Sequence, residues 1–480
     1  MEVFGRRFNF KTSTGCMTVQ FSPKDIVQSG LCIGCGSCVA QAGPAIAHMA
    51  FDSYGQLKPR GASEWIAAPS DSFSRTCPFS PAAPDEDYLS SRFMAPGTPR
   101  DRYAGQMVAA YVGHVTAEEH RLNGSSGGMV TWVAAELIRR GLVDGIAHVV
   151  AADDPAKQGR FFHYHIARTE TEVHQGAKSR YYPVELSRVL DEIRDSPGRY
   201  AIVGIPCFIK AIQLLRLKDA TFRERIVYTL GLFCGHMKSA RFVESFAWQM
   251  KVPVGKVSTL DYRHKFPDRP ANWYNTKLSL RDGTRVNKDW WHAVDGDWGA
   301  GFFMNSACNY CDDVVAETAD ISFGDAWVEP YASDGKGTNV VVVRSPEINS
   351  LLQAAIGAGQ LQLKVVDAAF VHQTQAAGFR QRREGLAYRL TLSRTGVKPV
   401  KRVLPDAGLI SADRKLIYRM RCYISKWSHR VFWLARVLKS PRIYLTWAKA
   451  IASVYHGVAY HKGSVRGMLN RFREFGRGIG

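Results

Sequence analysis

The chain lacks the cysteine density of a disulfide-stabilised protein, since it has only ten cysteines among 480 residues. Secreted domains that depend on disulfides are small and rich in cysteine, so this class is excluded. The first residues, MEVFGRRFNFKTSTG, lack the apolar run of a secretory leader. No uninterrupted apolar run reaches about 18 residues, so no transmembrane helix is expected. Together these absences predict a cytoplasmic protein in a reducing compartment.

Acidic residues are scarce in the last sixth of the chain. The net charge is +20, and residues 401–480 contain 17 Lys and Arg but only 3 Asp and Glu. The remaining residues are close to balanced, with 46% hydrophobic and 22% charged residues in the whole chain. This composition is ordinary for a globular protein, and the length suffices for two or three domain cores. The basic character therefore belongs to the C-terminal tail.

A closely spaced cysteine triplet is the strongest local signal. LCIGCGSCVA places three cysteines in a C-x2-C-x2-C array, and Thr76-Cys77-Pro78 supplies a fourth cysteine followed by proline. This pattern is typical of a 4Fe-4S cluster in a ferredoxin-like module, with the ligands Cys32, Cys35, Cys38 and Cys77. Zinc more often takes two C-x2-C pairs. A zinc site and buried free thiols remain the alternatives.

A second cysteine set is dispersed along the chain. Cys207 and Cys234 each follow a predicted buried strand, and Cys308 and Cys311 form a C-x2-C pair. Strand ends meet at one edge of an α/β sheet, so four thiolates could gather there around a second cluster. Alternatively, Cys207 and Cys234 are small buried hydrophobic residues and the pair is half of a zinc site.

A glycine- and serine-rich turn, NGSSGGMVT, precedes a predicted helix. Helix N-termini attract phosphate, so the turn is a candidate cofactor site, together with the later Lys-Ser pair. The candidate residues are Ser125, Ser126, Gly127, Gly128, Lys178 and Ser179. The turn matches neither the GxGxxG fingerprint nor the Walker A loop, and an ordinary turn with a helix cap is the alternative.

The order of predicted elements indicates an α/β fold with some α+β elements. Buried strands are predicted at 107–115, 146–151, 200–204, 226–233, 319–323 and 339–344, with helices at 129–141, 184–193 and 347–358 between them. The first strand, the glycine turn, its helix and the next strand read as a βαβ unit. Residues 255–300 look antiparallel. A proline-rich stretch from Pro81 to Arg102 is interpreted as a linker.

Taken together, the motifs resemble the beta-subunit family of coenzyme F420 hydrogenases and dehydrogenases. The similar stretches are CIGCGSC with TCP, GSSGGMVTWVAAELIRRGLVDG, GAKSRYYP, GIPCFIKAIQLL, GLFCGH, and CNYCDD followed by ADISFGD. They occur in the family's order over about two-thirds of the chain. The resemblance implies three parts: a ferredoxin-like iron–sulfur module at 1–80, a central α/β domain binding FAD and iron–sulfur at 103–395, and a basic helical extension at 396–480.

The same resemblance implies a cofactor set and an activity. Two 4Fe-4S clusters are expected, one on the N-terminal cysteines and one on Cys207, Cys234, Cys308 and Cys311, with FAD at the glycine and serine turn. Ferredoxin or a redox partner subunit would supply electrons, and coenzyme F420 or another small organic substrate would accept them. Alternatively, the chain is an electron-transfer subunit of a larger redox complex, linked to polysaccharide biosynthesis in some relatives. The catalytic acid is not identified; His163, His165 and His236 are candidates, each also consistent with a structural role.

The basic tail contains many aromatic residues. Between residues 414 and 460 apolar positions recur at helical spacing, interleaved with Lys and Arg. A basic amphipathic helix with Trp and Tyr suits the inner face of an anionic membrane. A helical hairpin packed on the body is the second interpretation. Nucleic acid is the third, but no recognition motif accompanies the charge.

Overall fold

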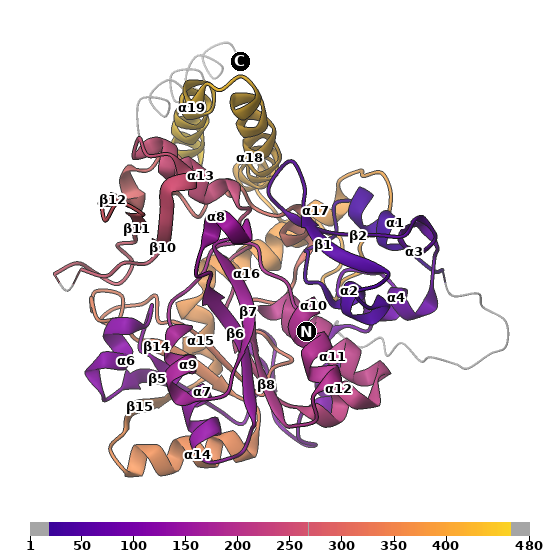
Figure 1. Ribbon diagram of the computed structural model, residues 1–480, viewed down its shortest axis with the longest axis vertical. Helices are drawn as coiled ribbons and strands as arrows, with labels where there is room; N and C mark the ends of the chain where they lie inside the picture. The colour runs from indigo at the N-terminus through magenta and orange to yellow at the C-terminus, as the bar shows by residue number, and fades with distance from the viewer. Residues whose placement is uncertain (1–18, 267, 462–480) are drawn as a thin grey trace.

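The computed structural model describes residues 19–266 and 268–461 (Figure 1). The described part of the chain begins with a small N-terminal unit. Ser22 and Asp25 form a capping box at the start of its first helix. The predicted module's residues before 19 lie outside the described part. The unit contains a β-hairpin and four short helices: α1 (Pro23–Gln28), α2 (Ser37–Ala42), β1 (Ala47–Phe51), β2 (Leu57–Gly61), α3 (Ser63–Ala67) and α4 (Asp71–Thr76).

An eight-stranded mixed sheet forms the centre of the molecule. Its strand order is β15-β5-β14-β13-β9-β8-β6-β7, in which the pairs β13–β9, β9–β8 and β8–β6 are parallel and the others antiparallel. The strands are β5 (Ala109–Val115), β6 (Gly145–Ala151), β7 (Phe162–Ala167), β8 (Tyr200–Gly204), β9 (Ile226–Leu232), β13 (Ile321–Asp325), β14 (Asn339–Val343) and β15 (Leu361–Val366). The predicted α/β class is confirmed.

Helices cover both faces of this sheet, because its central strands are apolar on both sides. One face packs against α7 (Met129–Arg139), α9 (Glu170–Gln175) and α14 (Pro346–Gly357). The other face packs against two groups of helices. These are α10 (Ser187–Asp195), α11 (Pro206–Lys218) and α12 (Ala220–Arg225), and then α15 (Ala368–Thr374) and α16 (Ala376–Arg382). The N-terminal unit packs beside α10 and α11, where Ile26, Leu31 and Phe73 join the same core.

The predicted βαβ unit is present, but its two strands are not neighbours. β5 and β6 run in the same direction and flank α7 in the chain, yet β14, β13, β9 and β8 lie between them in the sheet. The predicted strand positions agree with the observed ones to within two residues. The predicted helix at 184–193 begins later, at Ser187. The stretch interpreted as a linker contains α5 (Glu86–Phe93) and the short pair β3 (Arg100–Asp101) and β4 (Gly105–Gln106).

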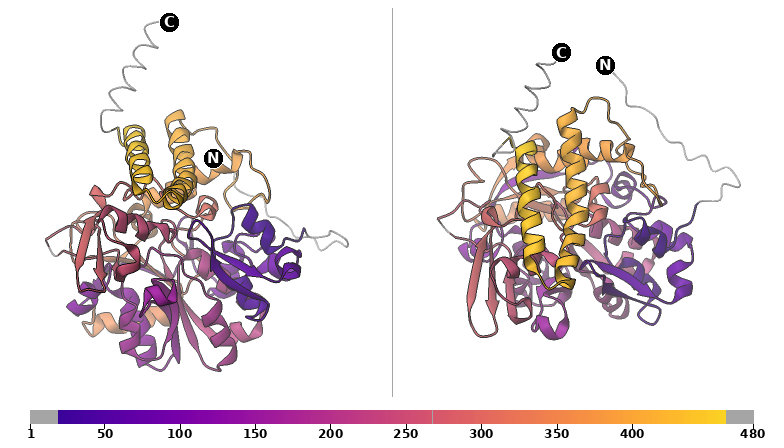
Figure 2. Two further views of the ribbon diagram at one scale, coloured as in Figure 1. Left: turned by 45° about the horizontal axis from the view of Figure 1, so that its top comes forward. Right: turned by 90° about the horizontal axis from the view of Figure 1, so that it is seen from above.

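A second core lies where the antiparallel segment meets the C-terminal helices. As predicted, this segment forms an antiparallel sheet of β10 (Val257–Asp261), β11 (Asn275–Leu280) and β12 (Arg285–Asp289). Two long helices, α18 (Ala412–Val437) and α19 (Pro441–Ala459), lie side by side across this end of the molecule (Figure 2). Their inner faces contribute Ile424, Phe432 and Tyr444 to the shared core. The helical prediction for the tail is confirmed as a packed hairpin, and residues after 461 lie outside the described part.

Five helices complete the described part of the chain, apart from single 3-10 turns. Four lie within or beside the central domain and one connects it to the C-terminal hairpin. They are α6 (Glu118–Asn123), α8 (Pro155–Gln158), α13 (Arg241–Gln249), α17 (Glu384–Thr391) and the already mentioned α5.

Candidate redox site

The N-terminal cysteine loop joins α1 to α2. Gly34 and Gly36 have φ of +82° and +84°, a backbone conformation that L side chains rarely adopt. A Cβ on Gly34 would also lie 2.5 Å from the Leu57 carbonyl oxygen. The two glycines therefore permit the tight path that brings three thiols to one side of the loop. Cys77 reaches them from the C-terminal end of α4.

All four N-terminal cysteines line one cavity. Its remaining walls are largely apolar and include Ile26, Met49, Phe73 and Phe79, and Pro78 follows the fourth cysteine as predicted. The cysteines lining it are Cys32, Cys35, Cys38 and Cys77. Four soft sulfur donors around a dry cavity fit a 4Fe-4S cluster.

Burial raises the pKa of three thiols of this set. The pKa of Cys35 rises to about 11, and the pKa values of Cys38 and Cys77 also rise, mainly by burial and further by the charges of neighbouring thiols. Without a metal these three thiols are therefore protonated at neutral pH, and any metal that they bind must displace those protons.

The loop is fixed to the rest of the chain through backbone groups. Lys58, which is buried, donates from Nζ to the Cys32 carbonyl at 2.6 Å. The Leu186 N–H donates to the Cys35 carbonyl at 2.9 Å, which ties the loop to the start of α10. The loop therefore sits against the central domain in a defined position.

The second cysteine set gathers at the carboxyl edge of the parallel strands. Cys207 lies in the first turn of α11 directly after β8, and Cys234 follows β9. Cys308 lies in a 3-10 turn at Ser306–Tyr310, and Cys311 ends that turn. Burial raises the pKa of Cys207, and the charges of Cys311, Cys234 and Cys308 raise it further.

A buried arginine lies beside this second set. Arg382, at the end of α16, is 4% exposed and donates to the carbonyls of Cys234 and Gly235 at 2.6 and 2.8 Å. Burial alone would lower its pKa, but the neighbouring Cys311, Cys234 and Cys308 raise the pKa above the ordinary value. The guanidinium therefore stays charged beside the thiols. Sequence spacing gave no signal for this residue.

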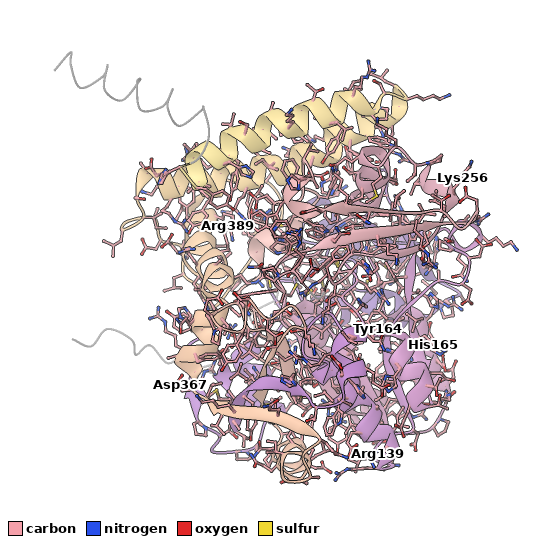
Figure 3. All side chains as sticks on the ribbon, turned by 90° about the vertical axis from the view of Figure 1, so that its left-hand side faces the viewer. Arg139, Tyr164, His165, Lys256, Asp367 and Arg389 are labelled. Carbon is pink, nitrogen blue, oxygen red and sulfur yellow. The ribbon has the colours of Figure 1, made fainter. Side chains whose placement is uncertain are left out.

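An aromatic pair lies near one thiol of each cysteine set. Tyr164 on β7 stacks with Phe208 on α11, with ring centroids 6.2 Å apart. Burial raises the pKa of Tyr164, and the charges of Cys207 and Cys35 raise it further. Cys35 also acts on the pKa of Cys207. One thiol of each set is therefore close to Tyr164, which Figure 3 labels on its strand.

The glycine and serine turn meets the Lys178–Ser179 loop, although the two are about 50 residues apart. The Ser179 N–H donates to Ser125 Oγ at 2.7 Å. Ser126 Oγ donates to the Thr338 carbonyl at 2.8 Å. The Lys178–Ser179 loop therefore lies against the glycine and serine turn, next to the N-terminus of α7.

Both glycines of the turn are needed for close packing. A Cβ on Gly127 would lie 2.8 Å from the Gly113 carbonyl oxygen on β5. Gly128 is the N-cap of α7 with a φ of +82° and makes no side-chain cap bond. The adjacent N–H, that of Met129, donates to Asn339 Oδ1 at 3.1 Å. The turn therefore packs directly on the sheet.

Basic side chains from the segment after β10 surround the turn. Lys265 Nζ donates to the carbonyls of Arg121, Ser126 and Lys336 at 2.5, 3.1 and 2.6 Å. Burial lowers the pKa of Lys265 to about 7, and Arg263 and Lys178 lower it further. Lys178 pairs with Asp261 at 3.3 Å. Basic side chains close to a helix N-terminus suit a phosphate-bearing ligand.

Arg263 and Lys265 were not identified from the sequence, because they belong to a segment interpreted only as antiparallel strands. Arg263 is buried, pairs with Asp325 at 2.9 Å and lies over the Tyr274 ring at 4.2 Å. Asp325 ends β13, at the carboxyl edge where the fold positions ligands. The Arg263-His264-Lys265 run after a strand was the available signal.

An aromatic series connects the turn with the second cysteine set. Tyr181, two residues after Ser179, stacks on Tyr274 at 6.5 Å and contacts Trp298 at 4.9 Å. Trp298 in turn stacks on His236 at 4.1 Å, and His236 follows Cys234 by two residues. The site is therefore continuous from the turn to the thiols through aromatic rings.

The three candidate histidines have different surroundings. His236 is buried and both of its ring nitrogens lack a hydrogen-bond partner in the structure. His163 is half-buried and lines a small cavity with Arg160 and Arg188. His165 is exposed on β7 (Figure 3). Of the three, only His236 adjoins the cysteines and the aromatic series.

Residues 19–266 and 268–461 contain no group of three or more His, Cys, Asp or Glu side chains arranged so that it could hold a metal ion. In the same residues no helix has the length and apolar character needed to cross a membrane.

The chain matches two family models in succession. Residues 110–191 match the coenzyme F420 hydrogenase/dehydrogenase beta subunit N-terminal model, and residues 198–369 match the C-terminal model. An uncharacterized protein of Methanocaldococcus jannaschii is 25% identical over 238 residues, which cover 46% of this chain and 57% of that protein. The chain thus spans little more than half the length of this curated relative.

A similar solved structure belongs to the F420-reducing NiFe hydrogenase complex from Methanosarcina barkeri. One chain of that complex is 17% identical, with a TM-score of 0.46, and the likeness covers 61% of this chain and 94% of that one. The two successive model matches together identify the family. The chain belongs to the beta-subunit family of coenzyme F420 hydrogenases and dehydrogenases.

Proposed function

We propose that the protein is an iron–sulfur flavoprotein oxidoreductase that moves electrons through two 4Fe-4S clusters to FAD and on to a two-electron acceptor. The main support is the continuity of the site: two groups of four cysteines adjoin each other, and the second leads through aromatic rings to the glycine and serine turn. Bound FAD would supply the exchange between one-electron and two-electron chemistry.

The residues have separate roles in this proposal. Cys32, Cys35, Cys38 and Cys77 would bind the first cluster, and Cys207, Cys234, Cys308 and Cys311 the second. Ser125, Ser126, Gly127, Gly128, Lys178 and Ser179 would bind the FAD pyrophosphate, with Lys265 and Arg263 adding positive charge. In this proposal the chain has three parts: the iron–sulfur module at 1–80, the flavin domain at 103–395 and the helical extension at 396–480.

Coenzyme F420 is the proposed acceptor, because the family's description names it. The donor would be ferredoxin or a partner subunit, since iron–sulfur clusters exchange single electrons. A second function is favoured by the family's description as a beta subunit: the chain would relay electrons within a larger complex whose other subunit holds the substrate. Turnover of F420 by the isolated protein supports the first function. Tight co-purification with a catalytic subunit supports the second.

Anaerobic purification followed by quantification of iron, sulfide and FAD tests the cofactor set. About eight irons, about eight sulfides and about one FAD per chain are expected. Cys32→Ala and Cys308→Ala should each lose about four irons. Cys422→Ala is the matched control, because Cys422 lies on α18 outside both cysteine sets. This variant should keep all of its irons. Zinc without flavin in the wild-type protein contradicts the proposal.

The flavin residues are tested separately. Ser125→Ala removes the hydroxyl that accepts from the Ser179 N–H, so FAD binding should weaken about fivefold while iron content stays unchanged. FAD affinity is measured by fluorescence titration of the flavin-depleted protein. Ser350→Ala, an exposed hydroxyl on α14, is the control. Equal FAD affinity in both variants would place the flavin elsewhere.

A further inference from the structure

The outer face of α18 carries a surface that the proposed redox function does not use. We define it by nine exposed residues at helical spacing: Leu416, Arg419, Tyr423, Lys426, Trp427, Arg430, Trp433, Leu434 and Val437. The opposite side of the helix is buried in the core, so this face points outward. The hairpin lies across one end of the molecule (Figure 2). At about 1.5 Å of rise per residue, this face spans about 30 Å along α18.

Large aromatic side chains on this face are open to solvent. Tyr423, Trp427 and Trp433 are 47%, 37% and 43% exposed. Trp and Tyr gather where water meets the membrane, because each combines an apolar ring with a polar group. Three of them in one stripe of a helix, accompanied by exposed Leu and Val, exceed the scattered apolar residues of an ordinary surface.

The cations on this face are not neutralised within the described chain. Arg419, Lys426 and Arg430 form no ion pair with any residue that the structure describes, and Arg430 lies over the Trp427 ring at 5.4 Å. No carboxylate belongs to the face, since the acidic residue of α18, Asp413, lies before it. The face is therefore both apolar and positive, which is complementary to anionic lipid headgroups.

We propose that the outer face of α18 binds the protein peripherally to an anionic membrane surface. The tryptophan rings would lie at the headgroup level and the three cations would contact the lipid phosphates. This binding is independent of the redox chemistry. It would orient the body so that the hairpin faces the membrane and the sheet lies beyond it (Figure 1).

Flotation with lipid vesicles tests the proposal on the purified, cofactor-containing protein. It should float with vesicles of phosphatidylcholine and phosphatidylglycerol but not with phosphatidylcholine alone. The triple variant R419Q/K426Q/R430Q should bind the anionic vesicles about 100-fold more weakly, because each basic residue near such a surface contributes about fivefold. The matched control K24Q/K218Q/K364Q removes three exposed lysines from other elements and should bind like the wild type.

A second measurement tests insertion directly. Brominated lipids should quench part of the wild-type tryptophan fluorescence, and the variant W427F/W433F should lose that quenching while keeping its helical circular dichroism. Equal vesicle binding by both triple variants overturns the proposal. The proposal is also overturned if the protein binds duplex DNA or self-associates in the absence of vesicles and R419Q/K426Q/R430Q abolishes that binding. Cofactor content is measured on the same samples, so failure here is distinguished from failure of the redox function.

Discussion

At the scale of single residues, charge beside the cysteines is the feature with the clearest chemical consequence. A cluster ligated by four thiolates is anionic and becomes more so on reduction, so a buried cation stabilises the reduced form. Arg382 holds such a charge against the second cysteine set, through two bonds to backbone carbonyls. It lies beyond the residues matched by the family models, which end at 369.

If the proposed second cluster is bound, Arg382→Gln should therefore lower its reduction potential by about 100 mV, the effect of one charge a few ångströms away. Potentiometric titration followed by electron paramagnetic resonance measures this potential. Arg382→Lys keeps a positive charge at this position, so its potential should stay close to that of the wild type. Arg380→Gln, an exposed change on the same helix, should leave the potential unchanged. Equal potentials in Arg382→Gln and the wild type would mean that Arg382 has only a packing role.

At the scale of elements, α18 is joined to the N-terminal unit by a buried histidine. His429 Nδ1 lies 2.8 Å from the Ser425 carbonyl, and Nε2 lies 3.2 Å from Gln56 Nε2 in the β1–β2 turn. Burial lowers the pKa of His429 to about 4. The neutral imidazole is therefore the form that the packed helix requires.

Acid should loosen this junction. The unfolded chain binds a proton at His429 below about pH 6.5, whereas the folded chain does so only near pH 4. The stabilisation is present above pH 6.5 and is lost as the pH falls towards 4, by about 3 kcal/mol in total. His429→Gln removes this titration, so its melting temperature should fall less than that of the wild type between pH 7 and pH 5. Parallel melting curves for the two proteins would contradict the assignment.

At the scale of the whole molecule, one buried ion network joins distant parts of the chain. Arg402 contacts Glu317 through two bonds of 2.7 and 2.9 Å and also reaches Glu86, Asp87 and Asp312. These partners come from α5 and from the segment that follows Cys311. The segment before the C-terminal hairpin is thereby fixed to the body next to the second cysteine set.

Arg402→Met should destabilise the fold by about 3 kcal/mol, because it removes the buried cation that Glu86, Asp312 and Glu317 share. Arg100→Met is the control, since Arg100 also contacts Asp87 but is exposed, and it should cost less than about 1 kcal/mol. Chemical denaturation of both variants measures the difference. Similar losses would show that burial of the network contributes little.

The local pattern of the sequence was sufficient for the main elements and for grouping the three closely spaced N-terminal cysteines. Strand and helix positions follow from apolar periodicity, and the C-x2-C-x2-C array follows from spacing along the chain. These are short-range properties, because backbone geometry over a few residues determines which side chains share a face. The Cys77-Pro78 pair was identified by its motif, and the fold brings Cys77 to the same cavity. The hydrogen bond between Ser125 and Ser179 joins two segments that the sequence analysis had grouped as one candidate cofactor site.

Only the tertiary structure decided which distant residues meet. Arg382, Arg263 and Lys265 have no distinctive spacing, and they reach the site because separate elements converge at the carboxyl edge of the sheet. The separation of β5 from β6 by four strands and the outward direction of the α18 stripe were likewise undetermined by local pattern. Contacts between distant residues depend on how the strands and helices are connected and packed in space. Spacing along the sequence does not determine this topology, so it cannot identify which distant residues meet.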